Sequence, residues 1–243
     1  MKKIMKYIPT IILTLLCSCS DYLDIVPDNV TTLDIVFNNR NTAERYLANC
    51  YHFVPDHGSV KRIPGMGAGH ECWFYTTNDS HFDNEVSFYI ARGLQNIDAP
   101  YANYWDGEGG SNLPMFRAIR ECNIFLDYVR DQHKVNDLTD SERKRWIAEV
   151  NVLKAYYHFF LFEHYGPIPI VDKALPVSTD PEGVKVTRMP VDQIVDYMVK
   201  LIDDSYKDLP PVITMEATEM GRLTQPAALA LKAKILLWAA SPL

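Results

Sequence analysis

Cysteine and positive charge are both scarce in this chain of 243 residues. It contains five cysteines, and its 24 lysines and arginines are outnumbered by 31 aspartates and glutamates, which gives a formal net charge of −7. So few cysteines exclude a small fold held together by disulfides. The shortage of positive charge leaves no basic stripe to neutralise phosphates, so we expect no nucleic-acid partner.

Sequence motifs of catalysis are missing as well. There is no Gly-x-Ser-x-Gly elbow, and His70 lacks a second histidine four residues later, which a zinc protease would need. Gly65–Gly69 is glycine-rich without the preceding strand and following helix of a dinucleotide site. The acidic residues Asp79, Asp83 and Glu85 lack EF-hand spacing, and we interpret them as a solvated loop rather than a glycosidase carboxylate pair. We therefore expect no enzymatic activity, no catalytic residues, no metal site and no cofactor.

The N-terminus has the pattern of an export signal. A lysine-rich start precedes the apolar run Ile8–Leu16, which is too short to span a bilayer as a stable helix. The following Leu-Cys-Ser-Cys places an aliphatic residue three positions before Cys19, which is typical of a bacterial lipoprotein box. Cys17 fits less well because Thr14 would take the aliphatic position. We expect residues 1–18 to be a lipoprotein signal peptide and Cys19 to carry acyl chains such as palmitate, which would anchor the protein to a membrane. The alternative is an ordinary secreted protein.

Removal of residues 1–18 takes away three lysines and moves the net charge from −7 to −10. Residues 19–40 are predicted to form an acidic, extended lead. Residues 41–243 are predicted to form one helical domain, and the chain is long enough for one sizeable core.

The stretch Trp146–Val171 predicts the central helix of that domain. Its polar residues Asn151, Lys154 and His158 are spaced as one narrow face of a helix, and most other positions are apolar or aromatic. Such a helix must be covered by neighbours on several sides. Gly166, followed by two prolines, predicts its end.

The other predicted helices have recognisable boundaries. Asn41 with Glu44, and Thr139 with Glu142, have capping-box spacing, and the remaining helices are predicted over 114–130, from about 190, and over 226–240. Asn123 falls on the inner stripe of its helix, where we expect a buried amide tying helices together rather than a ligand contact. The last helix carries six alanines that would allow close helix approach. The predicted fold is all-α, a tetratricopeptide-like helical solenoid with long irregular loops.

Four motifs in order resemble the SusD/RagB family of outer-membrane, glycan-binding lipoproteins. They are Cys19–Asp28, Ala118–Leu126, residues 148–169 (AEVNVLKAYYHFFLFEHYGPIP) and Ala228–Pro242. The resemblance implies a lipid-anchored, surface-exposed protein of the outer membrane that binds oligosaccharides and hands them to a SusC-like TonB-dependent transporter. Because family members are much longer, it also implies that the 41–243 domain is the N-terminal half of the family fold, truncated at its C-terminal end. Such a product would expose apolar surface on its last helices.

The candidate glycan-binding residues lie in the irregular region 55–112, where aromatic rings can stack on sugars and amides or carboxylates can bond hydroxyls. They are Trp73, Tyr75, Asn78, Asp79, Tyr101, Asn103, Tyr104, Trp105 and Asp106. The alternative is that these aromatics pack the loops against the helices. Two other functions stay open, a structural lid or adaptor of the transporter that touches no sugar, and a carbohydrate-active enzyme.

Overall fold

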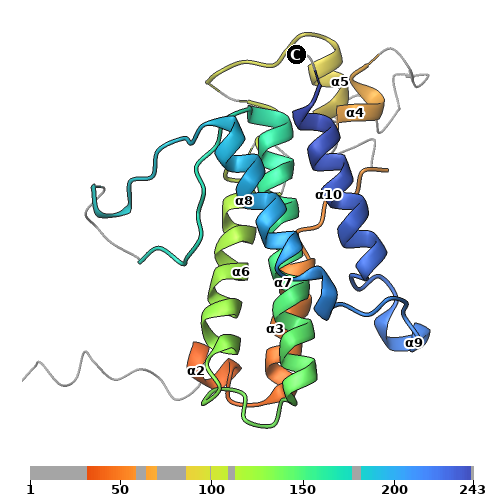
Figure 1. Ribbon diagram of the computed structural model, residues 1–243. Helices are drawn as coiled ribbons and strands as arrows, with labels where there is room; N and C mark the ends of the chain where they lie inside the picture. Colours follow the sequence, from red (N-terminus) through yellow and green to blue (C-terminus); the bar gives the residue numbers. More distant parts are fainter. Residues whose placement is uncertain are drawn as a thin grey trace, which may run out of the picture. The chain divides into compact units, whose positions relative to one another are not determined.

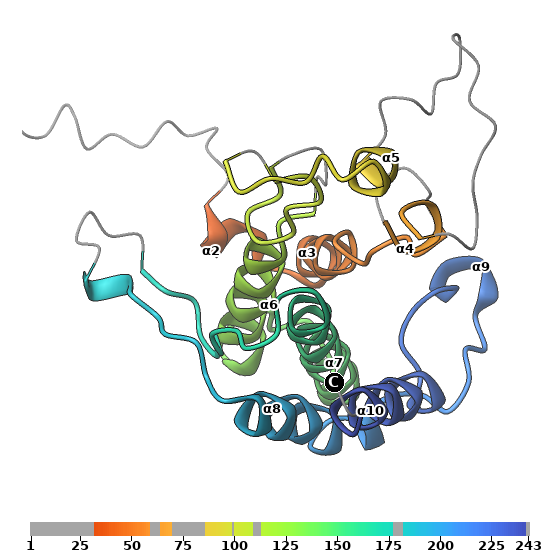
Figure 2. The same ribbon diagram turned by 90° about the horizontal axis from the view of Figure 1, so that it is seen from above.

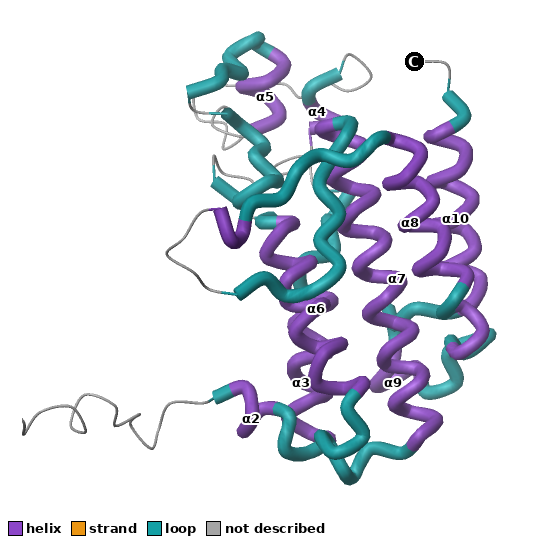
Figure 3. The backbone as a smooth tube through the Cα atoms, turned by 60° about the vertical axis from the view of Figure 1, so that its left-hand side comes forward, coloured by secondary structure: helices purple, strands orange, loops and turns teal. Residues whose placement is uncertain are grey.

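The computed structural model describes residues 32–58, 64–69, 86–98, 100–108, 113–176 and 182–241. The chain forms two compact units, Met1–Val36 and Phe37–Leu243. The short helix α2 (Leu33–Val36) is in the first unit, and every other helix named below is in the second. All regular elements of the described residues are helical, drawn in purple in Figure 3 between long teal loops. The predicted all-α class is therefore confirmed.

The helix α7 (Asp140–Tyr165) is the centre of the second unit. It contacts four other helices and the 3₁₀ turn η3 (Tyr206–Asp208), and the four helices are α3 (Arg40–Tyr51), α6 (Met115–Arg130), α8 (Val191–Asp203) and α10 (Gln225–Ala239). Figure 1 shows these helices running alongside one another, and in Figure 2 the others lie around α7. Sixteen of the 26 residues of α7 are buried, which confirms a helix covered on several sides.

Short elements lie between the long helices. They are α4 (Pro64–Gly67), α5 (Val86–Ala91), η2 (Glu182–Val184) and α9 (Glu216–Glu219). None of the helices in the described ranges combines the length and the apolar character that crossing a bilayer requires.

The ends of α7 are fixed by local chemistry. The Thr139 side chain accepts a hydrogen bond from the backbone N–H of Glu142, and the Glu142 carboxylate accepts from the N–H of Thr139, as the predicted capping box requires. Gly166 takes a φ of 67° at the C-terminal end, and its N–H donates to the carbonyl of Phe162. Any other residue would be strained at this angle, which explains the glycine.

The start of α3 differs from the prediction. The helix begins at Arg40, and its cap is Asn39, whose side chain accepts from the N–H of Thr42. Arg40 is held there by Glu142 of α7, 2.9 Å away, so a contact between distant segments favours the earlier start over Asn41. The lead predicted to be extended over 19–40 is also partly wrong, because α2 is helical. Residues 19–31 lie outside the described residues.

The prediction for α10 agrees with the structure to within one residue at each end. The helix runs from Gln225, with Thr224 as its cap, to Ala239. It lies against α8 and α7 and buries Ala228 and Ile235, while its other alanines are exposed.

Candidate functional site

Five of the nine candidate glycan-binding residues lie in one turn, residues 101–106, between α5 and α6. The other four, Trp73, Tyr75, Asn78 and Asp79, lie outside the described residues, as does Cys19. They stay predictions.

The polar residues of the turn are used to hold its shape. The Asn103 amide donates to the Asp106 carboxylate at 2.7 Å and accepts from the N–H of Trp105 at 3.1 Å. The same Asp106 oxygen accepts from the N–H of Glu108 at 3.0 Å. These two side chains therefore shape the backbone around Trp105 rather than extending freely toward a ligand.

Tyr104 belongs to the core. Its side chain is 1% exposed, and its ring packs edge-on against Phe160 and His164 of α7, with ring centroids 4.9 and 4.8 Å away. Its backbone N–H donates to the hydroxyl of Tyr165 at 2.9 Å. Burial raises the pKa of the Tyr104 hydroxyl. For this residue the alternative interpretation, packing of the loop against a helix, is correct.

Tyr101 is half-buried and already has an aromatic partner. It stacks on Tyr89 of α5 with centroids 4.6 Å apart and planes 15° apart. The Gln95 side chain bonds both backbone groups of Tyr101, at 2.7 and 2.9 Å. The stacked pair is fixed in place, with one ring face covered.

Trp105 is the candidate that lines a cavity. The cavity has a volume of about 230 Å³. Its walls come from the turn, from α6, from the segment after α7 and from the approach to α8, and they are Trp105, Phe116, Arg120, Pro169, Val171, Lys173, Leu175 and Val186. Sequence patterns gave no sign that these distant segments meet.

The Trp105 ring is oriented by two aromatic neighbours. The ring centroid of Phe116 lies 4.6 Å away at a tilt of 60°, and that of Tyr165 lies 5.6 Å away in an edge-on arrangement. The guanidinium of Arg188 lies 5.4 Å from the Trp105 ring centroid, within the range of a cation–π interaction. The indole is thus a rigid apolar wall beside positive charge.

The polar face of α7 lies behind the segment that follows Gly166. The Lys154 ammonium is 1% exposed and donates to both the carbonyl and the carboxylate of Asp172, each at 2.8 Å. The Tyr197 hydroxyl donates to the same carboxylate. Burial lowers the pKa of Lys154, an effect that Asp172 partly offsets. Burial also acts to raise the pKa of Asp172, but the bonds from Lys154 and Tyr197 lower it overall.

His158 is also fully buried on this face. One ring nitrogen, Nδ1, lies 2.8 Å from the carbonyl of Lys154, and the N–H of Val171 donates to Nε2. This pairing requires a neutral ring with its hydrogen on Nδ1. Burial lowers the pKa of His158 to about 4. The stripe of Asn151, Lys154 and His158 is therefore structural, tying α7 to the segment that leaves it.

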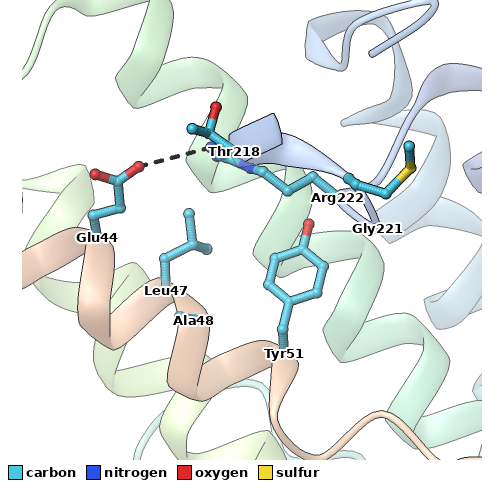
Figure 4. Close-up of a pocket in the computed structure, with 8 residues that line it drawn as sticks. Glu44, Leu47, Ala48, Tyr51, Thr218, Gly221 and Arg222 are labelled. Atoms are coloured by element: carbon cyan, nitrogen blue, oxygen red, sulfur yellow. Dashed lines mark ion pairs between the residues drawn. The ribbon is translucent and has the colours of Figure 1, made fainter. Parts of the chain in front are cut away.

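Another cavity, of about 320 Å³, lies between α3 and the segment 218–222 (Figure 4). Glu44 and Tyr51 face Arg222 across it, and Glu44 is 3.9 Å from the guanidinium. Arg222 also bonds the carboxylate of Glu149, which is fully buried and bonded by Tyr51 and Arg145 as well. The third cavity, of about 430 Å³, shares Tyr51 with this one and has mainly apolar walls. In the cavity between α3 and the segment 218–222, the guanidinium of Arg222 is therefore neutralised by the carboxylates of Glu44 and Glu149.

Metal ligation finds no support in the parts of the chain that the structure describes. No three histidine, cysteine, aspartate or glutamate side chains there lie close enough to hold an ion together.

Comparison with known proteins identifies the family. Residues 21–237 match the model of a SusD-like family described as "Starch-binding associating with outer membrane". No curated protein matches the chain.

Solved structures have the same fold. The protein named BT4246 is 27% identical, with a TM-score of 0.64 over 84% of this chain and 32% of its own. A laminarin binding SusD-like protein is 18% identical, with a TM-score of 0.64 over 84% of this chain and 41% of its own. Surface glycan-binding protein A from Bacteroides uniformis is 16% identical, with a TM-score of 0.60 over 82% and 42%.

The chain thus spans between 32% and 42% of the length of these structures. Their likeness confirms the tetratricopeptide-like helical fold. Since the family model covers most of the sequence, the chain belongs to the SusD-like, or SusD/RagB, family.

Proposed function

We propose that this protein binds glycans at the cell surface and hands oligosaccharides to a SusC-like TonB-dependent transporter. The observation that carries the proposal is the match of residues 21–237 to a family described as starch-binding. Laminarin binding by one structural neighbour and glycan binding by another support the same class of ligand. Members of the family bind carbohydrate rather than transform it, which favours a binding protein over an enzyme.

The Trp105 cavity is the place we assign to the sugar. An indole offers a flat apolar face to the C–H groups of a pyranose ring, and its orientation here is fixed by Phe116 and Tyr165. A fixed ring loses little conformational freedom on binding. A single site of this size gives an affinity in the millimolar to micromolar range, about −4 to −8 kcal/mol.

The location follows from the same proposal. The family is described as associating with the outer membrane, and we assign the anchor to acyl chains on Cys19. The intact mass of the protein extracted from membranes with detergent tests this point. A mass that includes residues 1–18, or that lacks acyl groups, would contradict it.

Glycan binding is tested with the full chain on a panel of oligosaccharides, followed by titration of the best ligand. We expect Trp105→Ala to weaken binding about tenfold, because a buried aromatic contact of this kind contributes more than 1 kcal/mol. Trp238→Ala is the matched control, since Trp238 is 37% exposed on α10 and does not line the cavity. It should bind as the wild type does.

Three outcomes would contradict the proposal. Equal loss in both tryptophan variants would mean that the cavity is not the site. No binding to any glycan, together with co-purification with the transporter, would favour the structural lid or adaptor. Release of product from a polysaccharide would favour an enzyme.

A further inference from the structure

Three positively charged side chains surround the Trp105 cavity. Arg120 of α6 and Lys173 are among its walls, and the guanidinium of Arg188 lies over the Trp105 ring. The three come from different segments of a chain whose net charge is −7. Positive charge is therefore gathered at one place on an acidic protein.

None of these three cations has a carboxylate partner among the described residues. The Arg120 guanidinium donates to the carbonyl of Leu175, and that of Arg188 donates to the carbonyls of Tyr165 and Pro167, the latter at 2.8 Å. Carbonyls fix the position of a guanidinium without cancelling its charge. Lys173 is exposed to solvent.

Elsewhere, several buried or half-buried cations pair with carboxylates, although the buried Arg143 donates to backbone carbonyls of residues 129–135 instead. Arg222 and Arg145 both pair with Glu149 and Glu219, and Lys154 pairs with Asp172. The cavity between α3 and the segment 218–222 therefore holds cations and anions together, whereas the walls of the Trp105 cavity hold cations without anions.

Glu121, which follows Arg120 in sequence, accepts from the Tyr46 hydroxyl and lies 3.9 Å from Arg117. Two carboxylates that follow other residues of the cavity are also engaged away from the three cations. Asp106, next to Trp105, accepts from Asn103 and from the N–H of Glu108. Asp172, next to Lys173, accepts from Lys154 and Tyr197. Neither forms an ion pair with Arg120, Lys173 or Arg188 within the described part of the chain.

From this arrangement we infer that the Trp105 cavity selects glycans that carry an oxyanion, a uronic acid carboxylate or a sulfate ester. The inference rests on the proposed function and names the class of sugar at the same site. Trp105 stacks on the sugar ring while the cations pair with the anion. A guanidinium whose remaining donors are aligned by backbone carbonyls is well suited to a carboxylate or sulfate, because its planar fork matches their geometry.

The test compares ligands that differ only in charge. The full chain is titrated calorimetrically with an oligogalacturonate and with its carboxyl-reduced form, and with a sulfated galactan oligosaccharide and its desulfated form. We expect at least tenfold tighter binding of one charged ligand than of its neutral partner. This preference should decrease as salt increases, since salt screens exposed charges. A preference within the galacturonate pair would identify the anion as a carboxylate, and a preference within the galactan pair would identify it as a sulfate ester.

The variants Lys173→Gln and Arg188→Gln should each reduce the ratio of charged-ligand to neutral-ligand affinity several-fold. Arg188→Lys keeps the positive charge and should reduce this ratio less than Arg188→Gln does. Lys144→Gln is the matched control. Lys144 is an exposed lysine near the start of α7, about 30 Å along the helix from Tyr165. It should leave the preference unchanged. Lys173 is exposed and bonds nothing in the described structure, so its variant tests the inference without loss of folding.

Each other result has a definite meaning. Equal binding of charged and neutral ligands would overturn the inference and leave glycan binding in place. Equal effects of Lys173→Gln and Lys144→Gln would mean that overall charge, rather than the cavity, sets the preference, which also overturns it. Failure to bind these ligands or any glycan would overturn the proposed function itself.

Discussion

Residue 158 is a histidine that the fold keeps uncharged. Both ring nitrogens have partners that need the neutral form, since Nδ1–H donates to the carbonyl of Lys154 and Nε2 accepts from the N–H of Val171. A proton on Nε2 would face that N–H, close to the Lys154 ammonium. The other groups that face the ring are Asp172 and Tyr197. The neutral ring is therefore a condition of stable packing.

This histidine should make stability depend on pH. Its pKa is about 4 in the folded protein and 6.5 as a free side chain, so between these values the unfolded chain binds a proton that the folded chain does not. Its contribution is complete above pH 6.5 and is lost as the pH falls toward 4, by up to about 3 kcal/mol. Urea unfolding of the wild type and of His158→Gln from pH 7 to 4.5 measures the effect.

The variant should show a flatter dependence on pH than the wild type. His133→Gln is the control, because His133 is exposed, and its curve should run parallel to that of the wild type. Parallel curves for wild type and His158→Gln would mean that the buried ring does not set this dependence.

Neighbouring residues also show what composition cannot predict. Tyr104 and Trp105 are adjacent aromatics with the same sequence signal, yet the first is in the core and the second lines a cavity. The difference comes from two residues of α7, some 60 residues away. The Tyr165 hydroxyl accepts a hydrogen bond from the backbone N–H of Tyr104, and the Phe160 ring packs against the Tyr104 ring. Local composition correctly indicated an aromatic cluster, but it carried no information on which side of the turn meets the helix.

At the scale of helices, local signals predicted the bounds well. The capping box at Thr139, the glycine at 166 and the prolines before α6 and α8 each act within one turn of helix, so sequence alone contains them. The cap of α3 was missed because two asparagines are two residues apart and a distant contact of Arg40 chooses between them. The alanines of α10 did not indicate which of them is buried: the helix lies against α8 and α7, and Ala228 is the alanine that it buries there.

The two asparagines before and within α3 give a direct test. We expect Asn39→Ala to lower the free energy of unfolding by about 1 kcal/mol, because the N–H of Thr42 loses its acceptor. Asn41→Ala should change it by less than about 0.5 kcal/mol, as for an ordinary surface substitution. Urea unfolding monitored by circular dichroism measures both. A larger effect at Asn41 would restore the cap predicted from sequence.

At the scale of the whole molecule, α10 carries an apolar surface. Leu229, Leu236, Leu237 and Trp238 are 44%, 44%, 75% and 37% exposed, in agreement with the expectation of apolar surface on the last helices. Clustered exposed side chains of this kind promote self-association. We expect Leu237→Lys to reduce light scattering of concentrated protein during heating.

The matched control is Val212→Lys, at an apolar residue that is 62% exposed and lies outside any helix. It adds the same charge without changing α10, so it should leave scattering close to the wild-type level. An equal reduction in both variants would attribute the effect to net charge rather than to the surface of α10.

The buried carboxylate of Glu149 also constrains the order in which the molecule folds. Its partners are Arg145 in the same helix, Tyr51 nearly a hundred residues earlier, and Arg222, 73 residues later. Burial of a carboxylate without its cations is costly. We therefore expect the middle of α7 to stay hydrated during folding until the segment around Arg222 has packed against it. On this expectation α7 can form early as a helix, and water leaves its centre only when Arg222 has joined Glu149.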